Sequence, residues 1–369
     1  MKITVYAIAK NEAKHVKRWM DSMKEADAVV VLDTGSTDGT PELLREAGAI
    51  VQVREITPWR FDVARNESMK LIPADTDIAV CTDLDEYFKP GWRQGLEYAW
   101  SKAAEGGAEP TTAKYEYVWN FEADGSDGAK FTYAKIHRPG VCRWTHPVHE
   151  ILDYDVPEVD VFVPGMRLEH HADPTKSRGQ YLELLAMSVK EDPDDDRNAH
   201  YYGRELMFHG RWQEAIAQLQ RHLAMPKATW KAERAASMRY IANCLLRIGS
   251  ENGERSAIEW FRAAIKEAPD RREAACELLE LAYGKEDWKL VIEAGEAAVR
   301  VQERGGDYLS KARDWGGWPW DILGLGYFYS GLPLQAVVCF RQAKRLYPEA
   351  EHGRLDRNIA CCDSSLPVR

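Results

Sequence analysis

Short apolar runs alternate with amphipathic stretches from the N-terminus to about residue 171. Four apolar runs predict strands, at residues 3–9, 28–33, 49–53 and 78–81. The intervening segments place apolar residues at helical spacing and predict helices, at residues 12–26, 34–48 and 61–72. Strands that alternate with helices are typical of βαβ units, so this α/β region is expected to contain a mainly parallel sheet with ligands at the carboxyl ends of its strands.

A second pattern occupies the middle of the chain, where aromatic residues alternate with polar ones. Three short runs predict strands of an antiparallel extension, at residues 113–121, 130–139 and 159–163. Between the last two runs, residues 142–152 (CRWTHPVHEIL) are dense in His, Trp and Glu for a loop. This composition makes the segment a candidate for catalytic or ligand-binding residues.

After about Pro174 the strand pattern disappears and the chain becomes all-α. Four helix pairs are predicted, at residues 198–226, 235–269, 274–301 and 318–348. Each has a turn with Gly or Asp and a second helix with an Ala-Ile or Ala-Val pair, a pattern that resembles tetratricopeptide (TPR) repeats of irregular period. A nonrepetitive helical bundle is the alternative. We expect two domains, at residues 1–173 and 174–369.

Composition excludes several classes of protein. The chain has 369 residues, of which 45% are hydrophobic, so it can bury a core. Its net charge of −10 argues against broad electrostatic binding to nucleic acid or to an anionic membrane. The seven cysteines are scattered without a C-x-x-C pair, which argues against a disulfide framework or a zinc site. No apolar run suits a signal peptide or a membrane span, so a cytoplasmic protein without membrane attachment is expected.

The most informative polar residues follow the apolar strand at residues 78–81. Asp83 and Asp85 lie two residues apart where the strand gives way to a turn, and Glu86 comes next. Carboxylates at this spacing can both reach one divalent cation, which would bridge a diphosphate and neutralise the charge on a departing nucleotide. The alternative is an ordinary acidic surface turn.

A second polar cluster, DTGSTDGT at residues 33–40, also follows a strand. Its glycines allow close approach of the backbone, and its hydroxyl groups can cap the next helix, whose N-terminus favours a phosphate or a ribose. A well-capped βα turn without a ligand would have the same composition.

Four segments, at residues 7–12, 29–40, 61–66 and 81–86, together resemble the nucleotide-sugar-binding half of family 2 glycosyltransferases, which have the Rossmann-like GT-A fold. The resemblance is close over about residues 3–90. The rest of the chain resembles more loosely those proteins that join such a domain to TPR-like repeats. The resemblance implies that the donor is bound by residues of all four segments: Ala7, Ala9, Glu12, Asp33, Ser36, Arg65, Asn66 and Asp83. It also implies that Asp83 and Asp85 bind a metal, with Asp85 as the direct ligand.

The later part of the catalytic domain resembles the family less closely. An inverting transfer needs a general base that deprotonates the acceptor, and Glu150 is the candidate because it lies past the sheet beside His149. A glutamate that simply begins a strand is the alternative. The resemblance implies a histidine ligand near the domain's end, where His170 is favoured over His171, with His149 as the rival. A packed histidine is the alternative for each.

These features favour a metal-dependent inverting glycosyltransferase that uses a nucleoside-diphosphate sugar, by family default a UDP-sugar, with Mn²⁺ or Mg²⁺. The acceptor is expected to be a peptide or protein that the repeats present. Alternatively, the repeats could serve to form a homodimer. Two alternatives stay open. One is an enzyme of the phage type that glycosylates hydroxymethylated DNA bases, which the net charge disfavours despite the local basic density of residues 227–240. The other is a noncatalytic TPR scaffold that binds a peptide.

Overall fold

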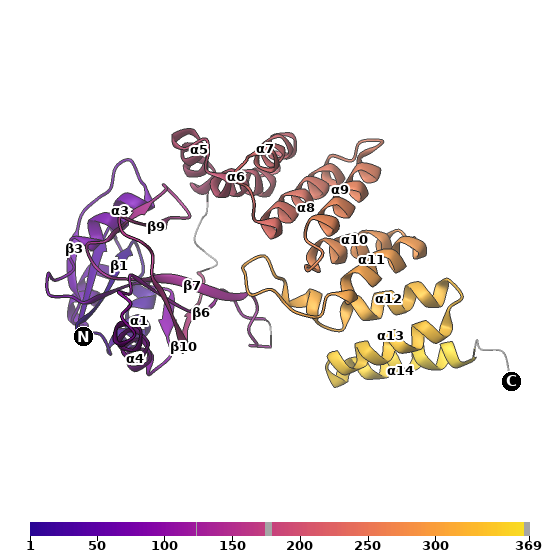
Figure 1. Ribbon diagram of the computed structural model, residues 1–369, viewed down its shortest axis with the longest axis horizontal. Coiled ribbons are helices and arrows are strands. Elements are labelled where there is room, and N and C mark those ends of the chain that lie inside the picture. Colours follow the sequence, from indigo (N-terminus) through magenta and orange to yellow (C-terminus); the bar gives the residue numbers. More distant parts are fainter. Residues whose placement is uncertain (123, 174–178, 365–369) are drawn as a thin grey trace. The chain divides into compact units, whose positions relative to one another are not determined.

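The computed structural model describes residues 1–122, 124–173 and 179–364, and its chain divides into two compact units, Met1–Lys190 and Glu191–Arg369 (Figure 1). The domain boundary predicted between residues 173 and 174 falls at residues 174–178, which lie outside the described residues. Helix α5 (Tyr181–Glu191) follows them, and all but its last residue belongs to the first unit.

The first unit contains an eight-stranded sheet in the order β3-β2-β1-β4-β7-β6-β10-β5. In chain order its strands are β1 (Ile3–Ala9), β2 (Ala28–Asp33), β3 (Ile50–Val53), β4 (Ile78–Cys81), β5 (Glu86–Phe88), β6 (Thr112–Val118), β7 (Lys130–His137) and β10 (Asp160–His170). The helices between the strands are α1 (Ala13–Met23), α2 (Thr40–Glu46), α3 (Phe61–Met69) and α4 (Trp92–Glu105). A separate hairpin consists of β8 (Cys142–Thr145) and β9 (Ile151–Tyr154).

Successive side chains of β1 point to opposite faces of the sheet, and helices cover both faces. Ile3 and Val5 belong to a core cluster with Trp19 of α1 and Trp100 of α4. Tyr6, which points to the opposite face, packs in a second cluster with Ala79, Trp144 and Met69. β1 pairs in parallel with β2 and β4, so the carboxyl ends of β1, β2 and β4 lie at one edge, as the apolar runs predicted.

The sheet is mixed rather than mainly parallel beyond β4. β7 runs antiparallel to both β4 and β6, as expected for the extension, but β10 runs parallel to β6. The expectation of a wholly antiparallel extension was therefore wrong. β7 ends at the end of the sheet where β6 begins, and β10, which adds beside β6, starts from that same end.

His137 at the end of β7 is fully buried and neutral. Its Nε2 accepts a hydrogen bond from the Tyr6 hydroxyl (2.8 Å), and its Nδ1 lies 3.1 Å from the carbonyl oxygen of Arg138. The Tyr6 hydroxyl in turn accepts a hydrogen bond from Trp144 Nε1 (2.8 Å). Burial lowers the pKa of His137 from 6.5 to about 4. Protonation would remove the acceptor that Tyr6 uses and place a charge in the core.

Because His137 is buried in its neutral form, we expect the folded protein to lose stability in acid. Between pH 6.5 and pH 4 the unfolded chain binds a proton at His137 that the folded chain does not, so stability from this residue is lost as the pH falls through that window. Over it, the free energy of unfolding should decrease by up to about 3 kcal/mol. Urea unfolding at a series of pH values measures the change. The decrease should be smaller by that amount in His137→Gln, and an identical pH dependence in the variant would contradict the assignment.

The second unit consists of antiparallel helices stacked in chain order (Figure 1). They are α6 (Asp196–Phe208), α7 (Trp212–Ala224), α8 (Lys231–Ile248), α9 (Gly253–Glu267), α10 (Glu273–Gly284), α11 (Trp288–Arg300), the 3₁₀ helix η1 (Ala312–Trp315), α12 (Trp318–Tyr329), α13 (Pro333–Leu346) and α14 (Glu349–Ser364). The four predicted helix pairs correspond to α6/α7, α8/α9, α10/α11 and α12/α13, which confirms an all-helical, TPR-like region. Helix α14, which the pattern did not predict, packs on α13.

Close packing of the helix pairs depends on small residues, as Gly324 of α12 shows. A Cβ atom added there would lie 2.6 Å from Cε1 of Phe340, a buried side chain of α13. Gly324→Ala should therefore reduce the free energy of unfolding by about 1–3 kcal/mol, because the ring must move within a packed core. Gly284 in α10 has no atom within 4 Å of an added Cβ, so Gly284→Ala should be neutral or stabilising by up to about 1 kcal/mol. Chemical denaturation measures both, and equal effects would argue against the packing explanation.

Six cysteines are buried, Cys81 and Cys142 in the first unit and Cys244, Cys276, Cys339 and Cys362 in the second. Burial raises the pKa of Cys81 and Cys244 to about 11, and that of Cys142 and Cys339 to about 12. Burial also raises the pKa of Cys276. These thiols are therefore protonated and shielded at neutral pH. Within the described residues, no helix combines the length and apolarity needed to cross a membrane.

Candidate active site

The loop after β2 is organised by the carboxylate of Asp33, which is fully buried at the strand's end. Its Oδ1 accepts hydrogen bonds from the backbone N–H groups of Gly35 (3.0 Å) and Ser36 (2.9 Å), and its Oδ2 accepts one from Ser36 Oγ (2.5 Å). Gly35 has φ 102°, a left-handed conformation that favours glycine. Asp33 therefore fixes the shape of this loop.

The loop after β1 lies against the loop after β2. Ser36 Oγ accepts a hydrogen bond from the backbone N–H of Asn11 (2.8 Å), and Thr40 Oγ1 accepts one from that of Glu12 (2.8 Å). The structure thus brings together Glu12, Asp33 and Ser36, three of the predicted donor-binding residues. Ala7 and Ala9, also predicted to contact the donor, have their side chains in the hydrophobic core. Their methyl groups pack against protein.

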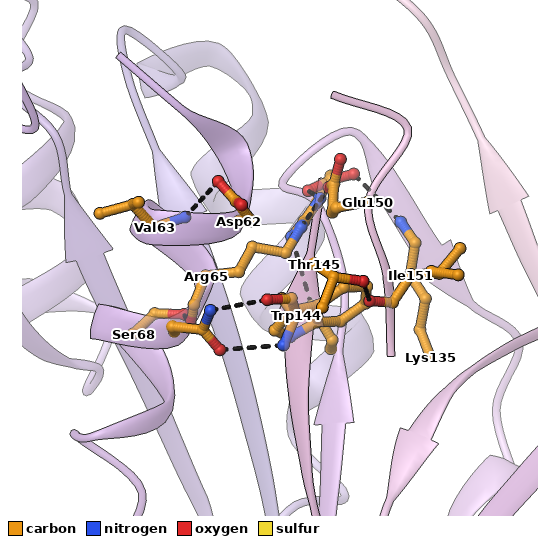
Figure 2. A network of polar contacts seen from close by, with 12 residues as sticks. Asp62, Val63, Arg65, Ser68, Lys135, Trp144, Thr145, Glu150 and Ile151 are labelled. Atoms are coloured by element: carbon orange, nitrogen blue, oxygen red, sulfur yellow. Dashed lines mark hydrogen bonds and ion pairs between the residues drawn. The ribbon is translucent and has the colours of Figure 1, made fainter. Parts of the chain in front are cut away.

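Arg65 on α3 is the centre of a buried ionic network. Its Nε donates to Glu150 Oε1 (2.5 Å), and its Nη2 donates to Asp83 Oδ1 (2.8 Å). Figure 2 shows Arg65 extending from α3 toward Glu150, with Trp144 beside it. The guanidinium carbon lies 5.2 Å from the centre of the Trp144 ring. Arg65, predicted to approach the diphosphate or sugar, is thus engaged by two carboxylates of the protein.

Lys135 on β7 completes the network from the opposite side of Asp83. Its Nζ lies 3.2 Å from Asp83 Oδ2 and 3.1 Å from Glu86 Oε1, which also accepts a hydrogen bond from the Tyr117 hydroxyl (2.6 Å). Of the two acids that Lys135 contacts, Glu86 is buried and Asp83 keeps 35% of its side chain exposed. Asp83 is therefore the more accessible of them to a ligand.

The charges of this network shift the pKa values of its members. Burial alone would raise the pKa of Asp83, but the charges of Arg65 and Lys135 outweigh burial and hold it well below its usual range. Burial raises the pKa of Glu86, and the nearby Asp83 carboxylate adds to the rise while Lys135 opposes it. Burial would lower the pKa of Lys135, yet Asp83 and Glu86 raise it well above its usual value. Asp83 is thus a carboxylate whose two oxygens both face cations.

Asn66 makes contacts within the protein rather than pointing to an open site. Its Nδ2 donates to the Trp144 carbonyl oxygen (2.8 Å), and its Oδ1 accepts from the Trp144 backbone N–H (2.9 Å). This pair of hydrogen bonds fixes β8 to α3. Both ends of the Asn66 amide are satisfied in this way, so the described contacts give it a structural role beside Arg65.

The side chain of Asp85 lies close to that of His170, the last residue of β10. The Nε2 atom of His170 lies 3.5 Å from Asp85 Oδ2, while its Nδ1 lies 2.9 Å from the carbonyl oxygen of Trp119. A carbonyl oxygen can only accept, so Nδ1 carries the hydrogen and Nε2 faces Asp85. Burial lowers the pKa of His170, but the contact with Asp85 and the charge of that carboxylate outweigh burial, so the net pKa is raised.

The other predicted residues lie in different surroundings. His171 Nε2 lies 3.0 Å from Arg18 Nη2, and its ring stacks on Phe121, so of the two adjacent histidines His170 is the one that faces Asp85. His149 follows the β8 strand, has φ 53°, and packs its ring edge-to-face with that of Tyr181 (5.8 Å between centroids). The carboxylate of Glu150 accepts the hydrogen bond from Arg65 described above, and 11% of its side chain is exposed.

The Asp85–His170 pair fits a divalent cation by its chemistry. A carboxylate oxygen and an imidazole nitrogen are ligands that Mn²⁺ accepts. Metal-binding histidines commonly donate their second ring N–H to a carbonyl or carboxylate, which is the arrangement of His170 and Trp119. Asp83 differs, because a cation that bound it would compete with Arg65 and Lys135. The donor set is therefore centred on Asp85 and His170.

Sequence reasoning missed the residues that hold the candidate ligands in place. Lys135 and Tyr117 lie on strands that were predicted without a function, and Trp119 acts through its backbone carbonyl, which no side-chain motif can reveal. The lysine within the apolar end of the 130–139 strand was the available signal, because a lysine is seldom buried without a partner.

Comparison with known proteins defines the class of the first unit. Residues 4–147 match the family model described as glycosyl transferase family 2. The chain therefore carries a family 2 glycosyltransferase domain, followed by TPR-like helical repeats.

Two curated relatives and one solved structure are similar to this chain over part of its length. A TPR repeat-containing protein of Synechococcus elongatus is 22% identical over 288 residues, covering 73% of this chain and 67% of that protein. An uncharacterized glycosyltransferase of Rickettsia bellii is 34% identical over 98 residues, covering 26% of this chain and 32% of that protein. The crystal structure of S. aureus TarS is similar at 12% identity and a TM-score of 0.34, covering 73% of this chain and 55% of that chain.

Proposed function

We propose that this chain is a metal-dependent, inverting glycosyltransferase that transfers a sugar from a nucleoside-diphosphate sugar, with UDP as the first donor to test. The observation that carries the proposal is the Asp85–His170 contact at the carboxyl end of β4, with Nδ1 of His170 fixed by Trp119. A bound Mn²⁺ or Mg²⁺ would supply charge neutralisation for the departing diphosphate. The Asp33 loop, close to Glu12 and Ser36, would hold the nucleoside end of the donor.

Glu150 is proposed as the general base that accepts the acceptor's proton. Arg65 contacts one of its oxygens, Oε1, and so orients the carboxylate. Arg65 also contacts Asp83, so the same guanidinium connects the proposed base to the acidic turn that carries Asp85. This connection supports a single site in which Arg65 acts as a positioning residue.

A peptide or protein is proposed as the acceptor, on the basis of the TPR-like unit. The DNA alternative gains no support from the basic segment at residues 227–240. Arg234 of this segment pairs with Glu267 (2.6 Å), and Arg239 is buried and pairs with Glu277 (3.1 Å). Two of its cations are thus neutralised by acids of the neighbouring helices α9 and α10, which reduces the charge available for phosphates.

The test is release of nucleoside diphosphate from a panel of UDP-, GDP- and dTDP-sugars with Mn²⁺, with Mg²⁺ and with EDTA. Metal-dependent release from at least one donor is expected, and background release from every donor in all three conditions would refute the enzyme and favour the scaffold. With the active donor carrying a labelled sugar, transfer to peptide mixtures and to hydroxymethylated duplex DNA then separates the two acceptor classes. The anomeric configuration of the product, determined by NMR, tests inversion.

A further inference from the structure

The second unit contains a cluster of three buried polar side chains where α6, α7 and α8 meet. His200 comes from α6, His222 from α7 and Glu233 from α8, and at most 4% of each is exposed. One potential ligand atom from each of the three lies within 4.8 Å of the other two. This cluster belongs to the helical unit and is separate in sequence from the Asp85–His170 pair.

A single serine orients both imidazole rings. Ser237 Oγ lies 2.7 Å from His200 Nδ1 and 2.9 Å from His222 Nδ1. The hydroxyl therefore engages the Nδ1 side of each ring. The Nε2 atoms of both rings are buried and have no hydrogen-bond partner among the described residues. Two buried ring nitrogens left without partners are costly, and they indicate a ligand between them.

The carboxylate of Glu233 is oriented from outside the cluster. Tyr308 donates a hydrogen bond to its Oε2 (3.0 Å), and its Oε1 lies 3.6 Å from His222 Nε2. This distance is too long for a hydrogen bond. It is close to the spacing of about 3.4 Å between ligand atoms that bonds of about 2.0–2.2 Å produce around a tetrahedral zinc ion.

Positive charges lie near His200. Burial, together with the charges of Arg204, Arg239 and Arg197, lowers the pKa of its imidazole well below the usual value. The same arginines would repel a weakly held cation, although Arg239 is paired with Glu277. This setting favours an ion that forms strong bonds to imidazole, such as Zn²⁺, over Mg²⁺ or Ca²⁺.

We propose that His200, His222 and Glu233 form a structural zinc site that joins the first three helices of the repeat unit. Two imidazole nitrogens and one carboxylate oxygen are a recognised set of three protein ligands for zinc, and a water molecule would complete the four-coordinate site. The cysteine pattern of the sequence, which argued against zinc, does not bear on a site made of histidine and glutamate. Since the three ligands come from different helices, the ion would stabilise the packing of α6, α7 and α8.

The test is zinc binding by the full chain, measured by equilibrium dialysis and metal analysis. To separate this site from the proposed catalytic one, the measurement is made in an Asp85→Ala/His170→Ala background. One equivalent of Zn²⁺ should bind there and should also remain in His209→Gln, a control at the end of α6. Affinity should fall at least 100-fold in His200→Gln and in His222→Gln, with far-UV circular dichroism to show that each variant is folded.

A second measurement keeps the proposal testable if a variant unfolds. Saturating Zn²⁺ should raise the thermal midpoint of the background protein by about 5–10 °C relative to EDTA. Co²⁺ in the same protein should give the intense visible absorption of four-coordinate cobalt rather than the weak bands of an octahedral ion. The proposal is overturned if this background binds no zinc, or if His200→Gln and His222→Gln are folded and bind zinc as tightly as it does. Neither readout depends on glycosyl transfer.

Discussion

Asp85→Asn is expected to reduce the rate of nucleoside diphosphate release by about 100- to 1000-fold at saturating donor and Mn²⁺. The substitution keeps the size of the side chain but removes the negative charge that faces His170 at 3.5 Å. If the pair holds the divalent cation, the variant loses the charge neutralisation that the departing diphosphate requires. A coupled assay of diphosphate release, with the donor identified from the panel, measures the effect.

Two further variants give this prediction its controls. Asp21→Asn, an exposed position on α1, should leave the rate unchanged. His170→Gln should mainly raise the Mn²⁺ concentration that gives half-maximal activity, by about 10- to 100-fold, and the rate should recover at high metal concentration. Activity of Asp85→Asn within threefold of the unmodified protein, in a folded sample, would rule out Asp85 as a metal ligand.

Arg65→Met is expected to lower the free energy of unfolding of the first unit by about 3–5 kcal/mol. Arg65 is buried and contacts Glu150 at 2.5 Å and Asp83 at 2.8 Å. A methionine of similar length would leave the Glu150 carboxylate beside an apolar side chain with its Arg65 hydrogen bond lost. Urea unfolding followed by circular dichroism measures the loss.

An exposed pair on the same part of the unit provides the matched control. Arg54 contacts Glu67 at 2.6 Å, but 53% of its side chain is exposed, so Arg54→Met should cost less than about 1 kcal/mol. Adding Glu150→Gln to Arg65→Met should recover part of the stability, because the carboxylate without a partner is then neutral. If Arg65→Met and Arg54→Met lower the free energy of unfolding equally, burial does not determine how much the Arg65 network contributes to stability.

The parts of the fold that depend on local pattern could be predicted from the sequence. The apolar runs of β1, β2 and β4 each end in polar residues, and parallel pairing places Asp33 and the acidic turn at one edge of the sheet. The helix pairs of the second unit follow from helical spacing, small residues and turns. In each case neighbouring residues carry the information.

The parts of the site that depend on distant pairing could not be predicted in this way. Lys135 reaches Asp83 because β7 pairs with β4, a contact between positions 52 residues apart. Trp119 orients His170 through a backbone carbonyl, and Asn66 fixes the backbone of Trp144, so neither contact leaves a side-chain motif. The parallel pairing of β10 likewise depends on its position beside β6 rather than beside β7, which composition alone does not determine.

Because each unit contains buried cysteines, thiol labelling can detect the unfolding of each unit separately. Maleimide reagents react with accessible thiolates, and the raised pKa and burial of Cys81 and Cys142 protect these thiols while the first unit is folded. Cys244, Cys276 and Cys339 are protected in the same way within the second unit. Mass spectrometry of peptides labelled during a denaturant series can therefore follow the sheet and the repeats separately in one sample, without an introduced probe.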